Sequence, residues 1–195
     1  MEAKDLDKIV RNKVDEVKRL VNRTIPVKVG NLAVRHFKAN FRKGGFVDNG
    51  LHKWKPAKRI GGTDAGSNYG TLTSGRNHLM NSTQYIPGIG AVRVFNDVPY
   101  ALIHNTGGTT HPTVTPQMRK YFWAMFFKTL GIKPGSGVKL PELLPPEAEK
   151  YKAMALTKKT TLTVNLPKRQ FIGESAELTA RIKTTIEKEI QKLAD

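Results

Sequence analysis

The chain has 195 residues, a length that predicts one domain able to bury a hydrophobic core. Cysteine is absent, which excludes disulfides and cysteine-ligated zinc sites. The 33 basic residues outnumber the 16 acidic ones, and the net charge of +17 favours acidic or polyanionic partners. The N-terminus lacks the apolar core of a signal peptide and no segment is long enough to span a bilayer, so we expect a soluble intracellular protein with no membrane contact.

Apolar residues recur at helical spacing over residues 3–22, and charged residues fill the other faces. This apolar set consists of Leu6, Ile9, Val10, Val14, Val17, Leu20 and Val21. The pattern predicts an amphipathic helix, which either packs on the protein's own sheet or forms a seam with a neighbouring subunit. Pro26 interrupts the pattern, and we expect a second helix to begin near Asn31 and to end at Gly44–Gly45.

Residues 44–70 are glycine-rich, basic and weakly patterned, and we expect a mobile basic loop there. Trp54 is its one anchor. It could stack on nucleic acid bases beside neighbouring cations, which are Lys53, Lys55, Lys58 and Arg59. A lone tryptophan in a loop more often docks into its own domain, and we favour that interpretation.

Two β-like runs, 83–86 and 91–96, flank Pro87–Gly90 and predict a hairpin. The chain then enters a corner at residues 97–108. Pro99 removes a backbone donor there, and Gly107–Gly108 allow a turn through positive φ. Between them, Tyr100 and His104 lie on a segment too short to predict as a helix. We expect the hairpin, this corner and the segment 167–175 to form one antiparallel unit.

A helix is predicted from Thr115–Pro116, a cap followed by proline, to Gly131. Its apolar residues cover several faces, so it is either a core helix or covered by a partner subunit, and the candidate interface residues are Tyr121, Phe122, Met125 and Phe126. A proline- and glycine-rich arm follows at 133–146, then a short helix at 147–156 and a strand at 160–164. The final helix begins near Glu174 and carries an apolar stripe with a four-residue step, Leu178, Ile182, Ile186 and Ile190.

No motif for catalysis is present in the sequence: it contains no phosphate-binding loop, no His-Glu-x-x-His and no Gly-x-Ser-x-Gly. His104, His111 and Asp97 could be considered for a metal, but their spacing matches no known site. We therefore expect no enzyme, no cofactor and no metal, and we interpret His104 as a buried hydrogen-bonding residue that fixes the corner.

Clusters of basic residues are the other candidates for function. Neutralising phosphates would give salt-sensitive contact with nucleic acid that is independent of base sequence. No recognition helix or zinc finger is present, so base-specific readout is not expected. The candidate polyanion contacts are Lys53, Lys55, Lys58, Arg59 and Lys168.

Four short motifs occur in order from Phe46 to the end of the chain. They are Phe46 with Trp54-Lys-Pro56, then Leu72-Thr-Ser-Gly75 leading to Leu79, then Pro99-Tyr100-Ala with His104 and Gly107-Gly108, and finally Pro167-Lys-Arg169 with Phe171-Ile-Gly173. In this order and spacing they resemble the virion-morphogenesis (tail-completion) proteins of Mu-like tailed bacteriophages. Residues 109–164 are longer than the core of that family requires.

The resemblance implies a structural protein of phage or prophage assembly that acts at the tail end or the head–tail junction as a ring-like oligomer, without catalysis. Its partners would be other phage head or tail proteins, first in the bacterial host cytoplasm and then in the virion. The alternative is a non-specific basic nucleic-acid-binding module.

The fold that we expect is α+β, with a twisted antiparallel sheet packed against the N- and C-terminal helices and an inserted helical arm. The whole chain, 1–195, is expected to form a single domain. Its expected parts are the N-terminal helices at 1–43, the mobile basic loop at 44–70, a core at 71–108 and 160–195, and the inserted helix and arm at 109–159.

Overall fold

The computed structural model describes residues 3–57 and 68–194 and divides the chain into two compact units. The first unit comprises residues Met1–Gly108 and Pro167–Asp195, and the second comprises Thr109–Leu166. The described residues contain both helices and small antiparallel sheets, which confirms the α+β class. The expected insertion at 109–159 corresponds to the second unit, which extends further, to Leu166.

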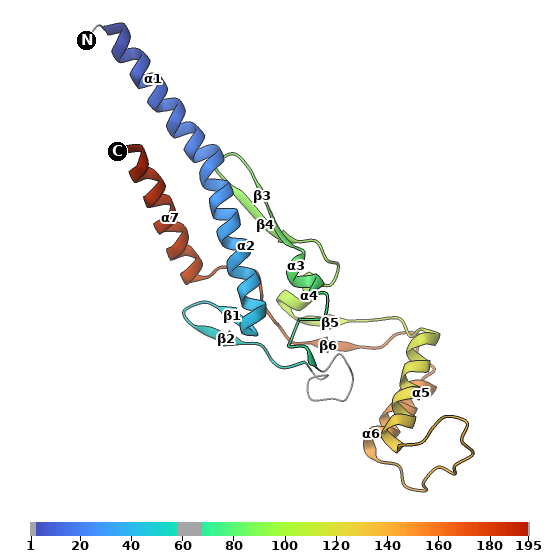
Figure 1. The fold of residues 1–195 in the computed structure, drawn as a ribbon. Coiled ribbons are helices and arrows are strands. Elements are labelled where there is room, and N and C mark those ends of the chain that lie inside the picture. The colour runs from blue at the N-terminus through green and yellow to red at the C-terminus, as the bar shows by residue number, and fades with distance from the viewer. Residues whose placement is uncertain (1–2, 58–67, 195) are drawn as a thin grey trace. The chain divides into compact units, whose positions relative to one another are not determined.

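The N-terminal part of the first unit is one continuous helical run (Figure 1). It consists of α1 (Ala3–Arg19), a π-helical segment η1 (Leu20–Thr24) and α2 (Ile25–Lys43). The predicted break at Pro26 is wrong. Pro26 lies in the first turn of α2, and the π turn before it accommodates the missing N–H by pairing the Ile25 N–H with the Leu20 carbonyl. α2 ends at Gly44, whose φ of 65° suits glycine.

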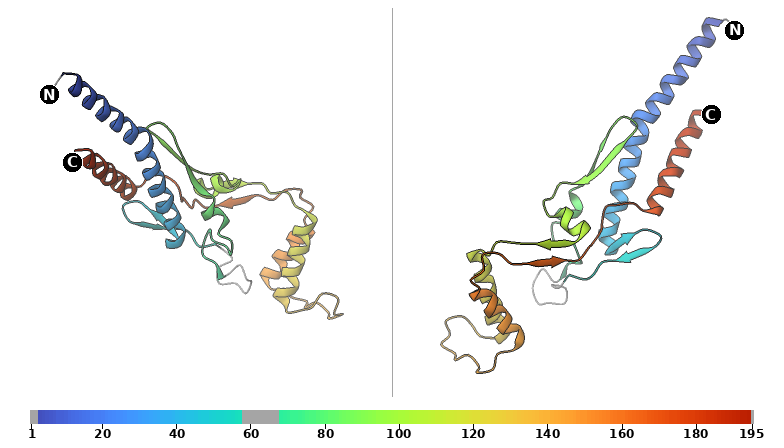
Figure 2. Two further views of the ribbon diagram at one scale, coloured as in Figure 1. Left: turned by 45° about the horizontal axis from the view of Figure 1, so that its top comes forward. Right: turned by 180° about the vertical axis from the view of Figure 1, so that it is seen from behind.

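α2 is the central element of the first unit and lies between two other elements. Its neighbours are α7 (Ala176–Ala194) and the hairpin of β3 (Thr83–Pro87) and β4 (Val92–Asn96) (Figures 1 and 2). The hairpin is the predicted one, and it pairs Tyr85 with Val94. Two buried clusters form the core, one of Leu32, Ala33, Phe37, Phe46 and Leu178, the other of Phe41, Trp54, Leu79, Val98, Ala101 and Phe171.

The predicted loop at 44–70 contains a second hairpin, of β1 (Gly45–Val47) and β2 (Leu51–Lys53). Its turn is held by the start of α7, because the carboxylate of Glu177 accepts hydrogen bonds from the N–H groups of Asn49 (3.0 Å) and Gly50 (2.9 Å). In the opposite direction, the carboxylate of Asp48 in the turn accepts a hydrogen bond from the N–H of Ala176 at the start of α7 (2.9 Å). The remainder of the predicted mobile loop includes residues 58–67, which lie outside the described residues.

The strands form three separate two-stranded antiparallel sheets in the described part of the chain, rather than the one unit expected. The reason lies in the corner, which is helical: α3 (His78–Asn81) precedes the hairpin, and α4 (Ala101–Thr106) follows it. α4 turns the chain before Gly107, so the hairpin is not extended. Instead β5 (Gly108–Thr110) pairs with β6 (Val164–Leu166), the strand before Pro167.

The second unit is a helix pair at the end of a two-stranded ribbon. α5 (Pro116–Leu130) is capped by the Thr115 side chain, which accepts from the Met118 N–H, and it ends at Gly131, as predicted. It packs against α6 (Pro146–Leu156). The predicted strand at 160–164 is displaced: Thr161 makes only an isolated bridge with Thr113, and the strand begins at Val164.

Candidate functional site

The corner and the segment 167–173 form the best-connected polar site of the first unit. Asn105, on α4, accepts hydrogen bonds through Oδ1 from the N–H groups of Phe171 (2.8 Å) and Ile172 (3.0 Å), and its Nδ2 donates to the Ile172 carbonyl (3.0 Å). From the other side, buried Asn40 of α2 donates to the Phe171 carbonyl at 3.3 Å. Two amide side chains therefore satisfy a backbone segment that forms no sheet.

Trp54 and Arg169 join this segment to the residues after β2. The indole N–H of Trp54 donates to the Gln170 carbonyl at 2.8 Å, and its ring is buried with an edge contact to Phe41. The interpretation that Trp54 docks into its own domain is confirmed. Arg169 is buried, and its guanidinium donates to the carbonyls of Lys55 (2.9 Å) and Pro56 (3.4 Å). Both side chains thus donate hydrogen bonds to backbone carbonyls, and these bonds hold the two segments together.

The role predicted for His104 needs a correction. Its backbone carbonyl, not its imidazole, links the two segments, by accepting from the Arg169 N–H at 2.8 Å. The imidazole is half-buried, and its Nδ1 is a buried atom without a hydrogen-bond partner among the described residues. Burial, followed by the nearby charge of Arg169, lowers the pKa of His104 below its ordinary 6.5, so the ring is neutral at physiological pH. Asn105, the next residue, performs the role that the sequence analysis gave to His104.

Other motif residues shape the corner. Pro99 and Tyr100 are exposed, and the Tyr100 ring meets the His104 ring edge-on with centroids 5.9 Å apart. Gly107 and Gly108 have φ values of 72° and 134°, which confirms the predicted positive-φ turn. At Gly173 a Cβ would lie 2.1 Å from the end of the flexible Gln170 side chain, which would have to move aside.

A shallow hollow opens beside the corner. It is lined by Ala57, Tyr69, Leu72, Thr73, Ser74, Leu79, Tyr100, His104 and Arg169. Its polar groups are hydroxyls, one neutral imidazole and a guanidinium bound to backbone carbonyls. Among the described residues that line it, none is a carboxylate.

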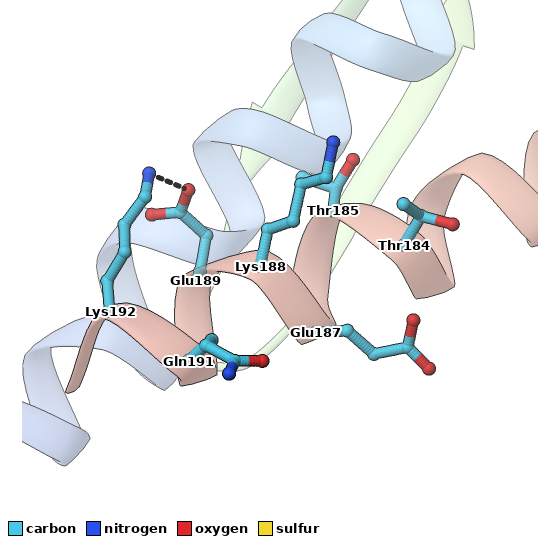
Figure 3. A pocket seen from close by; sticks show the side chains of 7 residues that line it. All are labelled: Thr184, Thr185, Glu187, Lys188, Glu189, Gln191 and Lys192. Atoms are coloured by element: carbon cyan, nitrogen blue, oxygen red, sulfur yellow. Dashed lines mark hydrogen bonds and ion pairs between the residues drawn. The ribbon is translucent and has the colours of Figure 1, made fainter. Parts of the chain in front are cut away.

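A second hollow lies along α7, and the described residues that line it all belong to that helix (Figure 3). Its lining residues are Thr184, Thr185, Glu187, Lys188, Glu189, Gln191 and Lys192. Lys192 pairs with Glu189 at 2.8 Å, and Lys28 of α2 also pairs with Glu189. The carboxylate of Glu189 is therefore paired with one lysine of α7 and one of α2.

The described residues contain neither a cluster of metal ligands nor a helix able to cross a membrane. Within residues 3–57 and 68–194, no group of three or more His, Asp or Glu side chains is placed to hold a metal ion. Within the same ranges, no helix has both the length and the apolar character needed to cross a membrane.

The candidate interface on α5 is largely internal to the second unit. Phe126 is fully buried and Phe122 is 8% exposed, and α6 contributes the buried Ala148 and Ala155 opposite them. The core-helix interpretation is therefore the correct one for both phenylalanines. Met125 is half-buried, and Tyr121, at 55% exposed, is the one member of the set that lies on the surface of this unit.

Of the predicted polyanion contacts, Lys53, Lys55 and Lys168 are exposed, while Lys58 and Arg59 lie outside the described residues. The structure reveals a further basic surface on α2, which is not among the predicted contacts. No acidic residue occurs between Glu16 and Asp48, an interval with eight basic residues. That acid-free interval was visible in the sequence and is the signal that could have located it.

The apolar face of α1 is uncovered. Five residues in steps of four, four, three and four form what we term the apolar stripe: Leu6, Val10, Val14, Val17 and Val21, each 44–51% exposed. The interpretation in which α1 packs on the protein's own sheet is wrong, because this helix extends beyond the hairpin instead of covering it (Figures 1 and 2). Ile9, at the edge of the stripe, is also 51% exposed.

Comparison of the chain with models of protein families, with curated proteins and with solved structures gave no match.

Proposed function

We propose that this chain is a structural protein that acts by associating with further copies of itself and with other proteins of a phage or prophage virion. Its place is the tail end or the head–tail junction, where it forms a ring-like oligomer without catalysis. The order of the four motifs supports the phage assignment. The apolar stripe on α1 supports self-association, and it is the observation that carries the proposal.

The stripe is too large and too regular for a solvated helix face. α1 has 17 residues and is therefore about 26 Å long, and the stripe continues past it to Val21. Five aliphatic side chains in one row on a helix that does not pack on a core of its own are typical of a protein–protein contact. The spacing of three and four residues also suits a helix–helix seam.

A second copy of the chain is the occupant that the charges favour. Residues 5–19 carry five basic and four acidic side chains, so the flanks of the stripe are nearly balanced although the whole chain carries +17. Three ion pairs form within the helix, between Arg11 and Asp7, Lys13 and Glu16, and Lys18 and Asp15. A balanced flank repels neither itself nor its copy. A membrane-surface helix would instead be rich in basic residues and carry aromatic anchors, which α1 lacks.

The internal connections of the corner agree with a structural role. Asn40, Trp54, Asn105 and Arg169 all direct their polar atoms at backbone groups of the same unit. Side chains bonded in this way stabilise the conformation of the unit, and these polar atoms are not directed at a substrate. In this role the protein would be made in the bacterial host cytoplasm and would then become part of the virion.

Light scattering coupled to size exclusion tests the proposal. The wild-type chain is expected to elute as a defined multimer of its 21.7 kDa mass, and Val10→Ser/Val17→Ser to shift it to the monomer. The matched control is Lys8→Ser/Asp15→Ser, which places two serines on the charged face of the same helix without changing the net charge. A monomeric wild type at micromolar concentration, or a stripe variant that stays multimeric, would overturn self-association.

Capsid and tail-tube genes next to the gene for this chain would support the virion assignment, and their absence would count against it.

A further inference from the structure

The exposed face of α2 carries a row of cations that the assembly role does not use. Lys28, Arg35, Lys38 and Arg42 are separated by seven, three and four residues. At 3.6 residues per turn they fall within about 80° of the helix circumference, in one row about 21 Å long. We term these four residues the basic stripe.

The cations of the basic stripe differ from those of α1 in their pairing. Among the described residues, Arg35, Lys38 and Arg42 form no ion pair with a carboxylate, and α2 itself contains no acidic residue. Lys28 pairs with Glu189 of α7. Three cations in one row without carboxylate partners repel one another. An anion bound from outside the chain would relieve this repulsion, because the described part of the chain pairs no carboxylate with them.

The surface around the stripe is hollowed and positive. A groove between α2 and α7 is lined by Lys28, Asn31, Leu32, Arg35 and Thr185. Near the buried His36 of α2, Arg181 of α7 lowers the pKa of this histidine after burial does, whereas Glu177 raises it. Asn31 and Thr185 supply uncharged polar groups within the same groove. Cations with neutral donors beside them are the usual contacts of phosphate oxygens.

We propose that the basic stripe of α2, together with the α2–α7 groove, binds the phosphate backbone of duplex DNA without reading its sequence. B-form DNA presents one negative charge per about 1.7 Å of axis, or about 12 charges along the length of the stripe. The four cations lie in one row on the side of α2 that is not packed in the core, and this row matches the dense, regular charge of the DNA. The site lies on a different element from the apolar stripe, and the proposal does not rest on self-association.

Duplex rather than single-stranded nucleic acid is favoured by the absence of a stacking surface. Single-strand binding sites combine cations with exposed aromatic side chains. The aromatic residues of α2, Phe37 and Phe41, are buried in the core, and no exposed aromatic ring accompanies the stripe on this helix. The groups that remain on this face can contact phosphates and have no platform on which a base could stack.

Fluorescence anisotropy with a 30-base-pair DNA duplex of arbitrary sequence tests the proposal over a salt series. The variant Arg35→Gln/Lys38→Gln/Arg42→Gln is expected to bind at least about 10-fold more weakly than the wild type, and its slope of log affinity against log salt to fall by about 2 to 3. The control Lys120→Gln/Lys152→Gln/Lys159→Gln removes the same charge from the second unit and should stay within about 3-fold of the wild type. The single variant Arg35→Gln should lower the slope by about one unit, and it serves if the triple variant does not fold.

Each remaining outcome overturns the proposal. If the wild-type chain does not bind the DNA duplex, the proposal is wrong. Equal weakening by the stripe and control variants means that only the total charge matters. Equal binding of poly-glutamate in competition points to an acidic protein partner instead. Size-exclusion profiles of the same variants separate this test from the assembly proposal, because the stripe variant should keep the wild-type oligomeric state.

Discussion

The side-chain oxygen of Asn105 lies 2.8 Å from the backbone nitrogen of Phe171, and this contact joins segments 66 residues apart in the chain. The same oxygen accepts from the Ile172 N–H, and the amide nitrogen returns a bond to the Ile172 carbonyl. Phe171 is 1% exposed and lies in the core cluster with Phe41 and Trp54. Asn105 therefore determines where the chain re-enters the first unit after the second.

Replacing Asn105 with alanine is expected to lower the free energy of unfolding by about 1–3 kcal/mol, because the N–H groups of Phe171 and Ile172 lose their acceptor. Urea denaturation followed by circular dichroism measures the change. Asn31→Ala is the matched control, since the exposed Asn31 side chain donates to the Val27 carbonyl of its own helix, and its effect should be within about 0.5 kcal/mol. Equal effects of the two variants would show that the contact contributes nothing specific.

Gly30 tests the close approach of α2 to the β3–β4 hairpin. A Cβ on Gly30 would lie 2.2 Å from the ring of Tyr85. Alanine favours a helix over glycine by about 1 kcal/mol, but displacing a packed ring costs about 1–3 kcal/mol. We therefore expect Gly30→Ala to lower the melting temperature, although it improves helix propensity.

The double variant Gly30→Ala/Tyr85→Ala separates the two effects of the Gly30 substitution. With the ring removed, alanine at position 30 should be stabilising relative to Tyr85→Ala alone. A Gly30→Ala variant that is more stable than the wild type would show that the ring has room to move.

Features decided by local chemistry were predictable from the sequence. Thr115–Pro116 and Gly131 bounded α5 correctly, and the β3–β4 hairpin followed from alternation and a proline–glycine turn. Gly107–Gly108 likewise marked a positive-φ turn. Each of these signals depends on a few neighbouring residues.

Features decided by distant contacts were not predictable. Asn105 has an ordinary sequence context, and its importance comes from backbone groups 66 and 67 residues away. The β1–β2 turn is held by Glu177, more than 120 residues further along. The apolar pattern of α5 did not show what covers it, because a helix buried by α6 and one buried by a partner subunit have the same sequence pattern.

Two histidines make the stability of the first unit sensitive to mild acid. Burial is the largest cause that lowers the pKa of His36 and of His104 below 6.5, and nearby Arg181 and Arg169 lower them further. In the unfolded chain both titrate near their ordinary pKa, so below about pH 6.5 the unfolded state binds more protons than the folded state. Stability is therefore expected to fall as the pH is lowered from about 7 toward 5.

Urea denaturation at several pH values checks this prediction. The variant His36→Gln/His104→Gln should show a weaker dependence in that window. A double variant with the wild-type pH profile would contradict the assignment to these two rings.

Phe126 should stabilise the second unit and not the oligomer. It is fully buried in that unit and contacts the rings of Trp123 and Phe127 on its own helix. Truncating a buried phenylalanine to alanine typically costs about 3–5 kcal/mol, which is a large fraction of the stability of so small a unit. In Phe126→Ala, hydrogen exchange is expected to accelerate in peptides from residues 116–156 and to remain unchanged in peptides from residues 25–43.

Size exclusion of the same sample should show the wild-type oligomer, since the apolar stripe is intact. Tyr121→Ala is the control for α5, because this side chain is exposed and its loss should leave hydrogen exchange as in the wild type. The prediction is contradicted if the oligomer of Phe126→Ala dissociates while hydrogen exchange in residues 116–156 stays slow. That result would show that α5 lies in the subunit interface.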